Sequence, residues 1–276
     1  RWCAGLAAVI WLAARTTFEA LVLQRRNFRG VDVPVGAGMV LVMGVVAVEA
    51  ALAVLDVLGR RTPAQERFGL LLFLMASLGF GLLGLFDDLA AHGDDKGFRG
   101  HLGAMARGRL TTGGLKLAGG GLLAIVVVSA SGVDQLGELV VGATVVALSA
   151  NLANLFDRAP GRTAKVGLLL GLVLVGLTGA AERSVLVGLA AVLGAVLGLL
   201  AFDLREELML GDAGANVLGA AVGLGLVLTT GLGVQAIVLL VLVLLNAASE
   251  KVSYSRIIDR FAPLRFLDRL GRRPAE

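Results

Sequence analysis

The sequence predicts an all-α fold, a polytopic bundle of transmembrane helices with about nine spans. Of the 276 residues, 57% are hydrophobic and only 17% are charged, which gives a mean hydropathy of +0.86. Apolar runs long enough to cross a bilayer recur along the chain, and short polar connectors separate them. The 39 glycines are scattered through these runs, which suits close packing of membrane helices.

The spans follow from the apolar runs in chain order. Arg15 and Glu19 interrupt the first run, whereas the others carry few charges. The single cysteine, Cys3, excludes a disulfide framework. The predicted spans are 2–23, 35–58, 68–86, 115–131, 137–156, 165–181, 184–202, 213–230 and 233–250.

Positive charges orient the bundle. One set of alternate connectors holds most of the Lys and Arg residues, whereas the opposite set holds Arg60, Arg61, Arg67 and Arg183. By the positive-inside rule, the richer set faces the cytoplasm. The transmembrane domain therefore covers 1–250, with cytoplasmic loops at 24–34, 87–114, 157–164 and 203–212 and a cytoplasmic tail at 251–276.

The tail alternates apolar residues with arginines between 255 and 273. This pattern is typical of an amphipathic helix that lies on an anionic membrane surface. No internal repeat relates the two halves of the chain, which argues against a transporter built from inverted repeats. An ion-coupled transporter would also place acids near the bilayer midplane, whereas the acids described next lie at a cytoplasmic edge.

Two adjacent carboxylates, Asp87 and Asp88, directly follow the apolar run 68–86. Ionisable groups at a membrane boundary are costly to desolvate, and neighbouring carboxylates repel unless a cation or a shared proton relieves them. Plain capping explains them poorly, because a helix C-terminus disfavours negative charge. Asp157 and Asp212 flank other spans on the same predicted side. A divalent metal and a phosphate substrate could meet there.

Other polar residues extend this candidate site. Asn151 and Asn154 lie on one helix face that Asp157 continues, so these side chains could bind a nucleotide substrate or a metal; interhelical hydrogen bonding is the alternative explanation of the two amides. Asp212 opens a span, where it could also serve as an ordinary N-cap. Cationic side chains on a glycine-broken backbone suit diphosphate binding, although an ordinary positive-inside loop has the same composition. These residues are Lys96, Arg99, His101, Arg109 and Lys116.

At these residues the sequence resembles the polyprenyl-phosphate N-acetylhexosamine-1-phosphate transferase superfamily, which includes the phospho-MurNAc-pentapeptide translocase and the GlcNAc-1-phosphate transferases. The resemblance runs from about Asn27 to Leu270 and rests on four motifs in order. They are a Pro-Thr-Gly-Gly-like signature at Pro34-Val35-Gly36-Ala37-Gly38, the paired acids Asp87 and Asp88, the Asn-x-x-Asn-x-x-Asp element at Asn151, Asn154 and Asp157, and a Gly-Asp-x-Gly-Ser-like element at Gly211, Asp212, Gly214 and Ala215.

The resemblance implies transfer of a sugar-1-phosphate from a UDP-sugar to a polyprenyl phosphate, for cell-envelope glycan synthesis at the cytoplasmic face of a bacterial inner membrane. It implies that Asp212 ligates Mg²⁺, for which Mn²⁺ could substitute, and that Asp157 positions the metal or the nucleotide. Asp87 or Asp88 would deprotonate or orient the lipid phosphate. A homodimer is compatible with this interpretation, and no nucleic-acid partner is expected.

Two departures from the family pattern concern the donor site. A second Asp is missing after Asp157, and the family's late histidine cluster is replaced by Arg265-Phe266-Leu267. Arginine binds phosphate in bidentate fashion, so Arg265, with Arg99 or Arg109, is a candidate for holding the donor diphosphate; contact with anionic lipid is the other explanation. The departures also leave open a catalytically diverged protein that binds lipid phosphate or regulates envelope synthesis.

Overall fold

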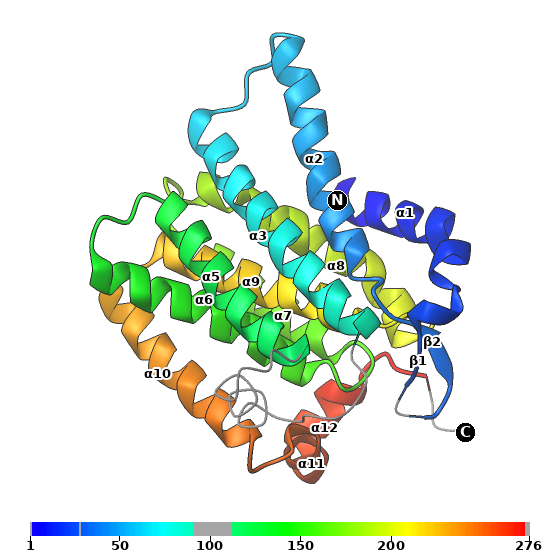
Figure 1. The fold of residues 1–276 in the computed structure, drawn as a ribbon. Coiled ribbons are helices and arrows are strands. Elements are labelled where there is room, and N and C mark those ends of the chain that lie inside the picture. The colour runs from blue at the N-terminus through cyan, green and yellow to red at the C-terminus, as the bar shows by residue number, and fades with distance from the viewer. Residues whose placement is uncertain (1, 28, 91–111, 274–276) are drawn as a thin grey trace.

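The computed structural model describes residues 2–27, 29–90 and 112–273. Within this part of the chain, seven helices are long and apolar enough to cross a membrane, which indicates a multi-pass membrane protein. Figure 1 shows them packed as a bundle. These helices are α2 (Met39–Val57), α3 (Ala64–Ala90), α5 (Thr112–Ala130), α6 (Leu136–Phe156), α8 (Val187–Leu204, preceded by the 3-10 turn η2, Arg183–Leu186), α9 (Gly211–Thr229) and α10 (Leu232–Ser249).

The predicted count of nine spans is not confirmed. Two of the expected spans correspond to shorter helices, α1 (Trp2–Phe18) with 17 residues and α7 (Arg162–Leu177) with 16. A helix needs about 20 apolar residues to cross the hydrocarbon core. α1 ends just before Glu19, which forms an exposed ion pair with Arg15 at 3.5 Å. The charges that interrupt the first apolar run therefore coincide with the end of its helix.

The connector predicted at 24–34 is not plain coil. After the 3-10 turn η1 (Leu21–Leu23), it folds into an antiparallel hairpin of β1 (Gln24–Arg26) and β2 (Asp32–Pro34). The Asn27 side chain accepts hydrogen bonds from the backbone N–H groups of residues 29 and 31, and Gly30 supplies a positive φ of 78°. Both are features of a tight turn. The described part of the chain is therefore helical with one small hairpin.

α9 is the central helix of the bundle. Its apolar window is 78% buried, compared with 11% for α10, and Figure 1 shows α9 in the middle of the molecule. Two glycines allow its amino end to sit close to its neighbours. A Cβ at Gly38 would lie 1.9 Å from the backbone nitrogen of Gly214, and a Cβ at Gly84 would lie 2.4 Å from the carbonyl oxygen of Asp212. Larger side chains at these positions would push α9 away.

The tail forms two short helices in place of the single amphipathic helix that the sequence predicts. They are α11 (Tyr254–Arg260) and α12 (Ala262–Arg269), and Figure 1 shows them below the bundle. Phe261 is extended between them, and Pro263 lies in the first turn of α12, where a proline is tolerated because its missing N–H is not needed. The side chain of Phe266 remains exposed, so α12 keeps an apolar outer face.

Candidate active site

The carboxyl ends of α3 and α6 and the amino ends of α5 and α9 meet at one end of the bundle. Most of the predicted acidic and amide residues gather there. Asp87 and Asp88 lie in the last turn of α3, so the helix continues past the predicted end of the span at residue 86 and runs to Ala90. The others come from three different helices: Lys116 from α5, Asn154 from α6 and Asp212 from α9.

Lys116 lies between two of these carboxylates. Its Nζ is 3.6 Å from Asp87 Oδ2 and also donates to Asp212 Oδ2. Asn154 Nδ2 donates to the same Asp212 oxygen at 3.2 Å. The three charged side chains remain 14–22% exposed. A cation in this position relieves the repulsion between neighbouring carboxylates, so part of the charge of the acids is neutralised within the protein itself.

Asp88 is placed differently from Asp87. Its Oδ1 accepts a hydrogen bond from Asp212 N at 3.0 Å and its Oδ2 one from Ala213 N at 3.1 Å. The carboxylate therefore caps the amino end of α9, where unpaired N–H groups and the helix dipole favour negative charge. Gly211 has a φ of +66°, and a Cβ there would come within 2.7 Å of Asp88 Oδ2. The geometry thus gives Asp88 an anchoring role: it fixes the backbone that carries Asp212.

Asp157 follows the last residue of α6 and lies close to the same acids. Its N–H donates to Asn154 O at 3.0 Å. Burial, and then the negative charges of Asp203 and Asp212, hold the pKa of Asp157 well above its usual range, against a hydrogen bond from the backbone of Gly211. A cation bound nearby would favour the ionised form.

A cavity of about 740 Å³ opens beside this cluster, with Asp87, Lys116 and Asn154 in its wall. Three further amides line it. Asn151 donates to Asn246 Oδ1 at 2.7 Å, and Asn216 is 2% exposed, with an Oδ1 that has no partner among the described residues. Most of the remaining wall is apolar and comes from α3, α5, α6 and α10, including Phe80, Leu83, Leu117, Leu148, Leu155 and Val243. Such a cavity suits a ligand with a charged head and an apolar body.

The donor atoms at this end of the bundle fit a hard divalent cation. Mg²⁺ prefers oxygen ligands and is usually held by one or two carboxylates, with substrate phosphates and water completing its shell. Asp212 and Asp157 could supply such carboxylates. No cluster of three acidic, histidine or cysteine side chains suited to a metal occurs in the described ranges, so the described side chains alone do not form a closed metal cage there.

Several predicted residues are not brought to this cluster. Lys96, Arg99, His101 and Arg109 lie outside the described residues. Arg265 lies on α12, where its Nη1 donates to Asp259 O at 3.1 Å, and it is not among the described residues that line the cavity.

The sequence prediction omits several polar residues that line the cavity, among them Asn216, Asn246 and Arg158. Asn246 is an isolated amide in an apolar helix, and Asn216 follows Asp212 by four residues on one helix face, so both could be recognised from the sequence. Arg158 directly follows Asp157 and counts among the positive charges of the connector 157–164, and its exposed side chain contributes to the cavity wall.

No protein-family model matches this chain, and no curated protein matches it significantly. The resemblance to the transferase superfamily therefore stays a prediction that rests on the four motifs.

Proposed function

We propose that this protein is a membrane enzyme that transfers a sugar-1-phosphate from a UDP-sugar to a polyprenyl phosphate. One observation carries the proposal: Asp87 and Lys116, which also pairs with Asp212, line a largely apolar cavity of about 740 Å³. The acceptor has the same two parts, a phosphate head and a long apolar chain. Its phosphate would meet the Lys116 ammonium while the chain follows the apolar wall.

Of the two adjacent acids, Asp87 lines the cavity, whereas both carboxylate oxygens of Asp88 accept hydrogen bonds from the backbone of α9. We therefore assign Asp87 to deprotonate or orient the acceptor phosphate. An acceptor oxygen attacks the β-phosphorus of the donor, a new P–O–P linkage forms, and the bond to the UMP oxygen breaks, so that UMP leaves. Lys116 and Arg158 would balance phosphate charge, since phosphoryl transfer depends on positioning and on electrostatic stabilisation.

Asp212 and Asp157 are the residues that would hold Mg²⁺, with Mn²⁺ as a substitute. When bound, the metal supplies neutralisation of the charge on the donor diphosphate. Asn154 orients the Asp212 carboxylate through its hydrogen bond, and Asp88 fixes the backbone beneath it. We assign the site to the cytoplasmic face of a bacterial inner membrane, because the connectors beside these acids carry most of the positive charge.

The proposal is tested with purified protein in lipid nanodiscs, supplied with Mg²⁺, undecaprenyl phosphate and a panel of radiolabelled UDP-sugars. We expect one donor to give a lipid-linked, organic-extractable product, and EDTA to abolish its formation. Asp87→Asn should abolish it too, whereas Asp134→Asn, an exposed acid in the connector between α5 and α6, should not. Absence of product with every donor, in a preparation that still binds the lipid phosphate, would contradict the proposal and support the catalytically diverged alternative.

A further inference from the structure

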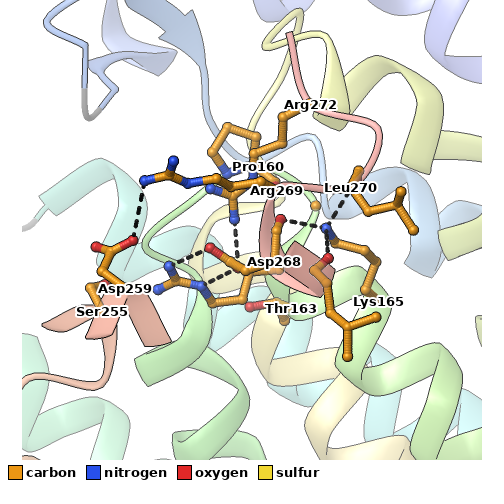
Figure 2. Close-up of polar contacts among 12 residues, drawn as sticks. Pro160, Thr163, Lys165, Ser255, Asp259, Asp268, Arg269, Leu270 and Arg272 are labelled. Carbon is orange, nitrogen blue, oxygen red and sulfur yellow. Dashed lines mark hydrogen bonds and ion pairs between the residues drawn. The ribbon is translucent and has the colours of Figure 1, made fainter. Parts of the chain in front are cut away.

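A second polar cluster lies on the segment that follows Asp157. Arg162 Nε and Nη2 donate to the two carboxylate oxygens of Asp268 at 2.8 and 3.0 Å. The two side chains are only 5% and 6% exposed. Arg272 Nη2 lies 2.6 Å from Asp268 Oδ1, and Figure 2 shows Arg272 and Asp268 meeting beside Pro160. We call Arg162, Asp268 and Arg272 the clamp; it joins the loop 157–162 to the tail helices α11 and α12.

The clamp is closed and tied to the backbone. Arg272 Nε donates to the carbonyl oxygen of Pro160 at 2.9 Å, and Lys165 Nζ donates to the carbonyl of Asp268 at 2.6 Å, near the end of α12 (Figure 2). Burial raises the pKa of Asp268, but hydrogen bonds and charge from Arg162 and the charge of Arg272 outweigh it, so the pKa lies below its usual value. The carboxylate is therefore ionised at neutral pH and remains paired.

The tail helices also contact the chain on the other side of Asp157. The ring of Tyr254, in α11, stacks on Phe156 with centroids 5.2 Å apart and an interplanar angle of 4°. The Tyr254 hydroxyl donates to the carbonyl oxygen of Leu245, which ties α11 to α10. Phe156 directly precedes Asp157. The tail helices therefore hold the chain immediately before Asp157 through Tyr254 and a few residues after it through the clamp.

The loop itself is irregular. Gly161 has a φ of +67°, and its N–H donates to Asp203 Oδ2 at 3.1 Å. Arg158 N donates to Phe156 O at 2.7 Å in a tight turn. Irregular backbone lacks the repeating hydrogen bonds of a helix, so its position depends on contacts from outside. The tail helices supply several of these contacts.

We infer that the tail helices fix the position of Asp157, with Tyr254, Arg162, Asp268 and Arg272 as positioning residues. The inference rests on the proposed function, in which Asp157 helps to hold the metal. None of these four residues is among the described residues that line the cavity, so they would act through Asp157 and not on the substrate. A site of this kind must hold its groups within about 0.5 Å of the productive geometry.

Two substitutions release the loop from opposite sides. Tyr254→Ala removes the stacked ring, and Arg272→Gln removes the donor to Pro160. Both leave the Arg162–Asp268 pair intact, which matters because an unpaired buried charge could prevent folding. Tyr254→Phe, the conservative control, keeps the ring that stacks on Phe156 and removes only the hydroxyl that donates to Leu245 O, so it tests whether the stacked ring, and not the bond to α10, holds the loop. Asp259→Asn is the second control, because it breaks an exposed ion pair with Arg269, 3.6 Å long, on the same helices (Figure 2).

Three quantities are measured for each variant: hydrogen exchange of the loop 157–162, the rise of the thermal unfolding midpoint on adding Mg²⁺, and the Mg²⁺ dependence of turnover. For Tyr254→Ala and Arg272→Gln we expect faster loop exchange with unchanged exchange in α9, a smaller Mg²⁺-induced rise, a higher half-saturating Mg²⁺ concentration, and turnover lowered by up to about 100-fold. Tyr254→Phe and Asp259→Asn should behave like the unmodified protein.

A purely structural role of the tail would reduce the amount of folded protein and leave its Mg²⁺ dependence unchanged. Unaltered loop exchange and Mg²⁺ dependence in both release variants would overturn the inference. Exchange and thermal midpoints need no turnover. A protein that shows the loop effects but transfers no sugar phosphate would therefore overturn the proposed function and still support the positioning role.

Discussion

The acidic cluster, which comprises Asp87, Lys116 and Asp212, and the clamp lie on either side of the loop 157–162 and are built from similar residue types. They differ in how completely their charged side chains are paired. In the acidic cluster, Lys116 pairs with two carboxylates. The side chains of the cluster are 14–22% exposed, and the cluster borders a cavity. In the clamp, Arg162 binds both oxygens of Asp268, and the two side chains are 5–6% exposed. Charge that is shared and accessible can bind a cation or phosphate, whereas charge that is fully paired and buried holds the chain in place.

Together with Asp87→Asn, the largest effect is expected from Asp212→Asn, which removes one carboxylate from the acidic cluster and leaves the clamp intact. The amide keeps the size of the side chain and can still accept from Lys116 and Asn154. It lacks the charge needed to hold a metal and to stabilise a charged transition state, so turnover should fall by at least about 100-fold. Single-turnover assays with the active donor measure this loss. Near-normal turnover by a correctly folded variant would remove Asp212 from the site.

Gly38→Ala should disturb the acidic cluster through the backbone alone. The added methyl group would lie 1.9 Å from Gly214 N, so α9 must shift, and with it Asp212. Overpacking of this kind costs about 1–3 kcal/mol in folding free energy, or more where backbone must move. Gly137→Ala is the matched control, because a Cβ there meets nothing within 4 Å. The midpoints of thermal unfolding in detergent are compared for Gly38→Ala and Gly137→Ala. Equal midpoints would mean that α9 tolerates the displacement.

Lys116→Gln sharpens the comparison, because it removes a cation that two carboxylates of the acidic cluster share. Asp87 and Asp212 should then repel, so the unfolding midpoint should fall in the absence of divalent metal and recover in part when Mg²⁺ is added. Differential scanning fluorimetry with and without EDTA measures both changes. If Lys116→Gln and the unmodified protein have equal unfolding midpoints both with and without EDTA, Lys116 does not balance the charges of Asp87 and Asp212.

Much of the fold could be predicted, because the bilayer imposes a length and a hydropathy that show in the sequence. The span predicted at 213–230 corresponds to α9 (Gly211–Thr229). The helical bundle is confirmed in its coarser form, with seven helices in the described ranges that are long and apolar enough to cross a membrane. Helix ends were harder to predict, since α3 continues through Asp87 and Asp88 to Ala90. Those two acids find partners on α5 and α9 that no local pattern reveals.

The candidate site divides in the same way. Asp87, Asp88 and Asp212 could be grouped because each flanks an apolar span on one predicted side of the membrane. Their separate roles could not be predicted from the sequence, since only the structure shows that Asp88 caps α9 and that Asp87 lines the cavity. The clamp had no sequence signal: Arg162 and Asp268 are 106 residues apart, and each resembles an ordinary charge of a connector or a tail.

The smallest effect is expected from Arg265→Ala, the substitution that tests whether the tail contributes to the donor site as well as to the position of Asp157. Arg265 lies on α12, donates to Asp259 O, and is absent from the described cavity wall. We therefore expect the KM for the donor to be unchanged, because a side chain that does not contact substrate cannot alter its binding directly. Phe266 is 67% exposed on the same helix, so this face of the tail suits an anionic membrane surface, and the substitution should weaken tail association with anionic vesicles. Donor kinetics and vesicle binding are measured at one fixed lipid composition. A raised donor KM with unchanged vesicle binding would return Arg265 to the donor site and extend the role of the tail from positioning to substrate contact.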